Sequence, residues 1–242
     1  MQRDVTKWII IFSCCVVFSC SKTTSVRPIY TPPSPITGKT YSADEITAFK
    51  QLTLNATNNI VVKLPRQVAI FLADTGYLYM TKEIDSIISQ VNRLLDTNLV
   101  LTRTADRFAS SLQIHLTDRN TYIGIEPSAA PVLQNAEHTG MAYLHWNDQG
   151  IVYRGSIFVD MQKTANDTLQ QRYLIHHEIM HAMGFLGHVK LPSIYTVLFY
   201  FTVTPYILNY TDFDKHIMQL LYNPSVKAGI KEAEFNEVVK NL

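Results

Sequence analysis

The sequence predicts an α+β domain in which one buried helix follows a group of strands. Three observations support this fold class. Short apolar or alternating segments typical of strands occur at 67–72, 99–102, 112–116, 141–146 and 151–160. An amphipathic helix is expected between the first two segments, and a helix that is apolar on most sides follows the last one. Two further helices are expected at 212–222 and 231–239.

The elements before the apolar helix each have a local signal. Apolar side chains recur at helical spacing between Thr81 and Asp96, which predicts an amphipathic helix there. Apolar and polar residues alternate in 112–116, so this strand should be half-buried, with His115 facing outward. The last two strands should form a hairpin, because Asn-Asp-Gln-Gly at 147–150 is a good turn sequence.

The predicted central helix, from Thr168 to Met183, carries a pattern typical of zinc sites. Residues 177–188 read HEIMHAMGFLGH. His177 and His181 are four residues apart, which on a helix places both imidazoles on one face, about 6 Å apart along the axis. Glu178 points about 100° away from His177 around the helix. It is therefore expected to be a general base that activates a water molecule, not a ligand.

A third histidine follows this helix. Gly184 is expected to end the helix in a left-handed turn, and Gly187 lies in the short loop that follows. His188 can then complete a set of three imidazoles, which leaves a tetrahedral Zn²⁺ with one open position for water. The neighbouring His176 points the other way on the helix and is expected to be packed or hydrogen-bonded.

The N-terminal segment predicts export and lipid attachment. Two basic residues precede an apolar run from Trp8 to Phe18, which is too short to span a bilayer and typical of a signal peptide. Val-Phe-Ser-Cys at 17–20 resembles the bacterial lipobox, so residues 1–19 should be a lipoprotein signal peptide and Cys20 the lipidated residue. An ordinary secretion signal or an uncleaved anchor is the alternative. The expected location is the bacterial cell envelope, as an outer-membrane lipoprotein.

Residues 20–42 should form a tether rich in Ser, Thr and Pro, and residues 43–242 one domain. All three cysteines belong to the first twenty residues, so a metal site in the domain must use His, Asp or Glu. The net charge of +1, without a basic run, gives no sign of a nucleic-acid partner. We expect a monomer that contacts the membrane only through its N-terminal lipid.

The order of elements, with the histidines, glutamate and glycine of 177–188, resembles the metzincin clan of zinc endopeptidases. The resemblance covers about residues 67–222. It implies a twisted mixed sheet with a backing helix, a central active-site helix and a smaller C-terminal helical subdomain. It also implies hydrolysis of a peptide or protein substrate by zinc-activated water, with Glu178 as general base. The substrate would pair with an edge strand, for which 141–146 is the candidate; an internal strand is the alternative.

Two positions depart from the metzincin pattern. The usual third ligand comes ten residues after the first, where this chain has Gly187, and the histidine follows one residue later as His188. Tyr195 stands where the clan has a methionine beneath the metal. Tyr195 and Tyr200 are candidates for assisting the oxyanion, and packing in the core or pocket wall is the alternative for both.

The C-terminal part is similar to an uncharacterised family of bacterial secreted, metzincin-like lipoproteins. The similarity lies in Pro-Ser-Ile-Tyr at 192–195, Thr-Asp-Phe-Asp at 211–214, Leu-Leu-Tyr-Asn-Pro at 220–224 and Lys-Ala-Gly at 227–229. Some members of that family lack zinc ligands, which implies an alternative function as a non-catalytic, metzincin-fold binding lipoprotein. A gluzincin-type peptidase is disfavoured, because the glutamates downstream of the motif begin only at Glu232.

Overall fold

The computed structural model describes residues 41–242, except 58, 135–137, 192 and 200–204. The predicted signal peptide, Cys20 and nearly all of the tether lie outside the described residues, as does Tyr200. Among the described residues, no helix combines the length and the apolar character that crossing a bilayer requires.

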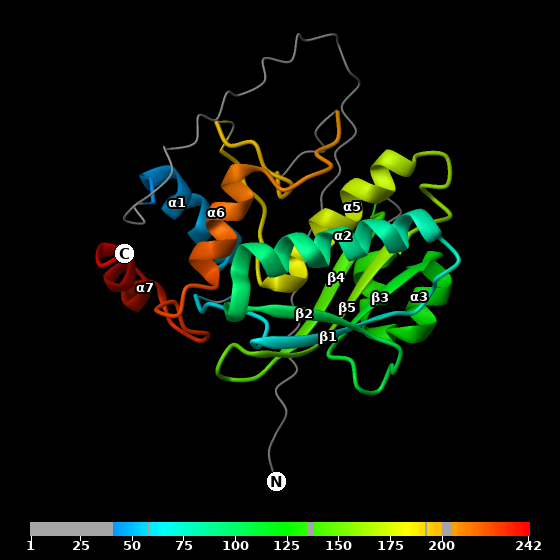
Figure 1. Cartoon of the computed structure of the whole chain (residues 1–242), viewed down its shortest axis with the longest axis horizontal. Helices are drawn as coiled ribbons and strands as arrows, with labels where there is room; N and C mark the ends of the chain where they lie inside the picture. The colour runs from blue at the N-terminus through cyan, green and yellow to red at the C-terminus, as the bar shows by residue number, and fades with distance from the viewer. Residues whose placement is uncertain (1–40, 58, 135–137, 192, 200–204) are drawn as a thin grey trace.

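A five-stranded mixed sheet forms the centre of the domain (Figure 1). Its strands are β1 (Gln67–Leu72), β2 (Val100–Thr104), β3 (Leu112–Thr117), β4 (Gly140–Trp146) and β5 (Val152–Asp160). The order is β2-β1-β3-β5-β4, and only β4 runs antiparallel to its neighbour. The predicted hairpin is therefore confirmed, and the strand expected at 141–146 lies at an edge of the sheet.

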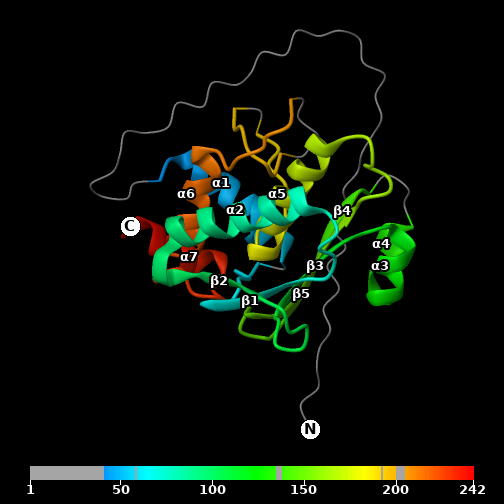
Figure 2. The same ribbon diagram turned by 45° about the vertical axis from the view of Figure 1, so that its right-hand side comes forward.

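The helices surround this sheet, so the predicted α+β class is confirmed. They are α1 (Ala43–Leu52), α2 (Leu78–Leu95), α3 (Arg119–Ile125), α4 (Ala130–Leu133), α5 (Thr168–Met183), α6 (Asp212–Leu221) and α7 (Glu232–Lys240), with short 3-10 helices η1 (Leu54–Ala56), η2 (Asp96–Asn98) and η3 (Pro127–Ala129). Helices α2 and α5 cross one face of the sheet. Helices α1, α6 and α7 gather on the side away from α3 and α4 (Figure 2).

Helix α5 is buried on nearly every side, as its sequence predicted. It packs against β4 and β5 on one side and against α2 on another. Side chains such as Ile175, Met180 and Met183 are fully enclosed, in a core that also includes Phe213 of α6 and Phe235 of α7. A helix held from several directions has little freedom to rotate, which suits an element that positions functional groups.

The second face of the sheet is covered by α3 and α4, which the sequence did not predict. Tyr122 of α3 stacks on Phe158 of β5 with ring centroids 4.6 Å apart, and its hydroxyl group pairs with Ser156 at 2.6 Å. The expectation that His115 faces solvent is therefore wrong, since this residue is only 3% exposed. Burial lowers the pKa of His115 to about 4, and its Nε2 has no hydrogen-bond partner among the described residues.

Candidate metal centre

Three histidine side chains converge at the C-terminal end of α5. The Nε2 atom of His177 lies 2.9 Å from that of His181 and 3.2 Å from that of His188. One ligand atom from each residue lies within 4.8 Å of the others. Nitrogen ligands 2.0–2.1 Å from a tetrahedral Zn²⁺ stand about 3.3 Å apart. The three rings are therefore spaced as donors to a single metal ion, and these residues could hold one.

Backbone carbonyl groups orient two of the three rings. The Nδ1–H of His177 donates to the carbonyl oxygen of Val197 at 2.7 Å, and that of His181 donates to the carbonyl oxygen of Phe185. These bonds place the proton on Nδ1 and leave the Nε2 lone pair free for a metal. Lone pairs that face each other so closely repel unless a cation lies between them, so the donor set fits a cation.

The electrostatics of the site favour neutral imidazoles. Burial lowers the pKa of His177 to about 4, and the hydrogen bond to Val197 opposes this shift. Burial and the neighbouring His177 lower the pKa of His188 to about 3, and burial also lowers the pKa of His181. All three rings are therefore unprotonated near neutral pH, which is the form that binds metal ions.

Gly184 turns the chain from α5 toward the third histidine. Its φ angle is 120°, and its N–H donates to the carbonyl oxygen of His181 at 3.0 Å. A Cβ atom here would lie only 2.1 Å from the carbonyl oxygen of Val62. Glycine is thus required both by the backbone conformation and by the close approach of the segment that precedes β1.

Gly187 makes a second close backbone contact, with the end of α1. Its N–H donates to the carbonyl oxygen of Leu52, the last residue of α1, at 2.9 Å. A Cβ atom at this position would lie 2.3 Å from the carbonyl oxygen of Gln51. Gly187, which stands at the position where the metzincin pattern has its third ligand, is thus the residue that contacts α1.

The Glu178 carboxylate lies against β4 and is 4% exposed. It accepts a hydrogen bond from the N–H of Ala142, and its Oε1 atom lies 2.6 Å from the point that a Cβ atom on Gly140 would occupy. Burial raises its pKa to about 8, although the bond from Ala142 opposes this shift. Nothing in the sequence had singled out Gly140 or Ala142, because both contacts depend on how α5 lies on the edge strand.

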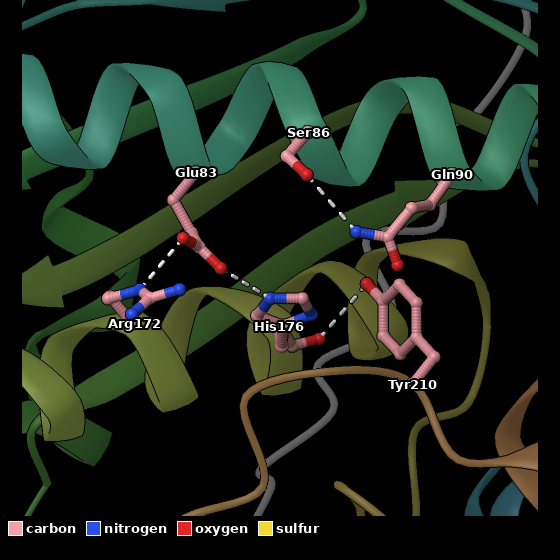
Figure 3. Close-up of polar contacts among 6 residues, drawn as sticks. All are labelled: Glu83, Ser86, Gln90, Arg172, His176 and Tyr210. Carbon is pink, nitrogen blue, oxygen red and sulfur yellow. Dashed lines mark hydrogen bonds and ion pairs between the residues drawn. The ribbon is translucent and has the colours of Figure 1, made fainter.

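An ionic network holds the opposite side of α5 to α2 (Figure 3). Glu83 of α2 accepts hydrogen bonds from Nε of Arg172 and Nε2 of His176, each at 2.8 Å. Tyr210 donates from its hydroxyl group to the backbone oxygen of His176 at 3.4 Å. The hydrogen bond from His176, aided by Arg172, lowers the pKa of Glu83. The prediction that His176 is hydrogen-bonded away from the metal ligands is confirmed, and the network restrains the rotation of α5.

The segment that contains Tyr195 runs against the histidines. The carbonyl oxygen of Val197 accepts from His177 and also from the hydroxyl group of Tyr173, at 3.1 Å. Tyr195 itself is half-buried and packs against the main core. Its hydroxyl group makes no hydrogen bond with any described residue, and its role in the oxyanion site stays a prediction.

One protein family matches nearly the whole domain. Its model aligns with residues 45–241, from α1 to α7, and its description is a protein of unknown function (DUF2927). The chain belongs to this family. No curated protein matches the chain. The matched residues of this chain include the histidine cluster, the edge strand and the part of α1 that contacts Gly187.

Proposed function

We propose that this DUF2927 protein is a zinc-dependent endopeptidase of metzincin type. The observation that carries the proposal is the convergence of three neutral imidazoles, with a buried carboxylate one residue after the first of them. Three further features support it: the glycine turn after α5, the mixed sheet with α2 and α5 on one face, and the passage of Val197 against His177.

The proposed roles follow from the geometry of each side chain. His177, His181 and His188 would hold the ion, and a bound Zn²⁺ supplies a Lewis acid that polarises the scissile carbonyl group and acidifies water. Glu178 accepts the proton of the attacking water molecule and passes it to the departing amine. Beside a cation this carboxyl group is ionised, despite its burial, and so can act as a base.

The substrate is proposed to be an extended peptide bound along β4. Among the described strands, β4 pairs only with β5, so its other edge can pair with a further strand. Ala142 lies in the middle of β4 and bonds to Glu178, so a peptide paired with this edge would lie beside the proposed base. The same edge serves recognition and brings the scissile bond to the histidines.

The proposed location is the bacterial cell envelope. It depends on the signal-peptide pattern of residues 1–19 and on lipid attachment at Cys20. The protein would then act as a tethered monomer on peptides or proteins, with no nucleic-acid partner.

Two substitutions test the mechanism, because they remove the base and a ligand separately. Purified protein is assayed for zinc by atomic absorption, and for chelator-sensitive cleavage of a denatured protein. We expect Glu178→Gln to keep zinc and lose cleavage, His181→Ala to lose both, and the exposed control Glu237→Gln to resemble the wild type. Cleavage by Glu178→Gln at the wild-type rate would refute this mechanism.

The non-catalytic alternative has a specific observation in its favour, because Tyr195 replaces the methionine that metzincins have beneath the metal. The same experiment separates the two functions. Stoichiometric zinc in the wild-type protein, without cleavage of any denatured substrate, would indicate a binding lipoprotein that keeps the fold and the metal.

A further inference from the structure

A cavity lies apart from the histidine cluster. It has a volume of about 440 Å³, and none of the three histidines or Glu178 lines it. Its walls come from residues 63–66 before β1, residues 97–98 before β2, and the segment 222–228 between α6 and α7. The last segment, orange to red in Figure 1, lies beside the start of the first sheet strands. The volume is within the range of small-molecule sites.

The charges around this cavity are all of one sign. Lys63, Arg66 and Lys227 line it, and no aspartate or glutamate does. None of the three forms an ion pair with any residue that the structure describes. Arg66 donates only to the carbonyl oxygen of Thr97, at 2.6 Å. The cavity therefore has a positive potential that the protein itself does not neutralise.

Lys63 is the innermost of the three cations. Its ammonium group donates to the carbonyl oxygens of Leu221 and Val226 and lies 5.7 Å from the centre of the Tyr222 ring. Burial lowers its pKa to about 8, with no carboxylate to oppose the shift. The two carbonyl groups hold the ammonium in place, and one of its three N–H donors remains for a ligand.

We propose that this cavity binds a small organic anion, whose carboxylate or phosphate group meets Lys63 and whose apolar part packs against Leu64, Ile151 and Tyr222. The anion provides the negative charge that the partly buried ammonium lacks. Because Lys63 is already held by the backbone, little side-chain entropy is lost on binding. Arg66 and Lys227 are exposed at the rim, where they attract the anion and can contact its acid group.

Simple amphiphiles with different head groups test the proposal by calorimetric titration of the full chain. Octanoate and octyl phosphate share the acid group, whereas octanol has the same chain without charge. We expect both anions to bind at least about tenfold more tightly than octanol, since a neutral head group leaves the ammonium unpaired. Equal affinities for octanoate and octanol, or no binding of either anion, would overturn the proposal.

Three variants localise the effect. Lys63→Gln should weaken octanoate binding by about tenfold, and Lys227→Gln by a smaller factor. Lys227 makes no polar contact with a described residue, so its variant keeps the argument testable if Lys63→Gln disturbs the end of α6. The matched control is Lys82→Gln, which removes an exposed charge on α2 and should bind as the wild type does. Wild-type affinity in both cavity variants would place the anion elsewhere.

The acid group could belong to a free metabolite or to a membrane lipid, and vesicles distinguish these sources. Co-sedimentation with phosphatidylglycerol vesicles, but not with phosphatidylcholine vesicles, and its loss in Lys63→Gln, would identify a lipid phosphate. Octanoate binding without vesicle binding would identify a free anion. Either result upholds the site, and neither depends on zinc or on peptide cleavage.

Discussion

Gly140→Ala tests whether the position of the Glu178 carboxylate, and not merely its presence, supports the proposed catalysis. A Cβ atom on residue 140 would lie 2.6 Å from Oε1 of Glu178 and 3.2 Å from its Cγ and Cδ atoms, whereas ordinary contacts begin at 3.4 Å. The carboxylate oxygen must therefore retreat by at least 3.4 − 2.6 = 0.8 Å. The obstacle is the free end of a flexible side chain, so we expect Glu178 to move while β4 stays in place.

The size of the effect follows from this displacement. Misplacing a catalytic group by about 1 Å can lower the rate about 100-fold, or about 2.7 kcal/mol of activation free energy. The three atoms nearest to the added Cβ all belong to Glu178 and none to a histidine, so zinc affinity and thermal stability should change little. We expect kcat to fall about 100-fold while the metal content stays at the wild-type level.

The assay combines kinetics with a measurement on the metal-free protein. Steady-state cleavage of a peptide gives kcat and KM, and a competing chelator gives zinc affinity. Hydrogen exchange at the amide of Ala142, which bonds to Glu178, should become faster in Gly140→Ala because its acceptor has moved.

Gly124→Ala is the matched control for this substitution. A Cβ atom at residue 124 would meet nothing within 4 Å, so this variant adds the same methyl group without a displacement. It should retain wild-type kcat and slow exchange at Ala142. If Gly140→Ala also retains wild-type kcat, while Glu178→Gln is inactive, then catalysis does not depend on the position that the Glu178 carboxylate has in this structure.

Three further predictions concern the supports of the site and the second face of the sheet. Gly187→Ala puts a methyl group 2.3 Å from the backbone oxygen of Gln51, so the loop of the third histidine must shift, and zinc affinity should fall about tenfold or more; unchanged affinity in a chelator competition would contradict this. Glu83→Gln leaves His176 without its charged partner and should lower the free energy of unfolding in urea by about 1–3 kcal/mol; a wild-type midpoint would show that the ionic network does not stabilise α5. His115 has a folded-state pKa of about 4, below its unfolded value near 6.5, so the folded protein binds fewer protons and loses up to about 3 kcal/mol as the pH falls from about 6.5 to 4. Replacing His115 with Leu should reduce this loss, and identical pH dependence in both proteins would show that the buried ring is not responsible.

The helices and strands that have a strong local sequence pattern were predictable from the amino-acid sequence. The strand at 67–72 and the central helix at 168–183 were predicted with the bounds that the structure has, because an uninterrupted apolar run and a long apolar helix need no distant contact to be recognised. The helix expected from Thr81 begins earlier, at Leu78. Its first turn lacks a side-chain cap, so no local signal marked its start.

Helices α1, α3 and α4 were missed for different reasons. For α1 a signal was present, since Ser42 and Glu45 form a reciprocal capping box that the sequence analysis did not use. Helices α3 and α4 have only seven and four residues, too few for a periodic pattern. Their absence from the prediction explains why His115 was expected to face solvent.

The sequence alone determined which residues could bind a metal, because the four-residue spacing of His177 and His181 sets their separation on any helix. It also determined that a carboxylate would stand beside them. Only the tertiary structure decided where that carboxylate points, since its neighbours Gly140 and Ala142 reach it through the packing of α5 on β4. The place of the third ring was likewise decided by contacts between distant segments, because a loop that contains glycines has no preferred path until other backbone groups hold it.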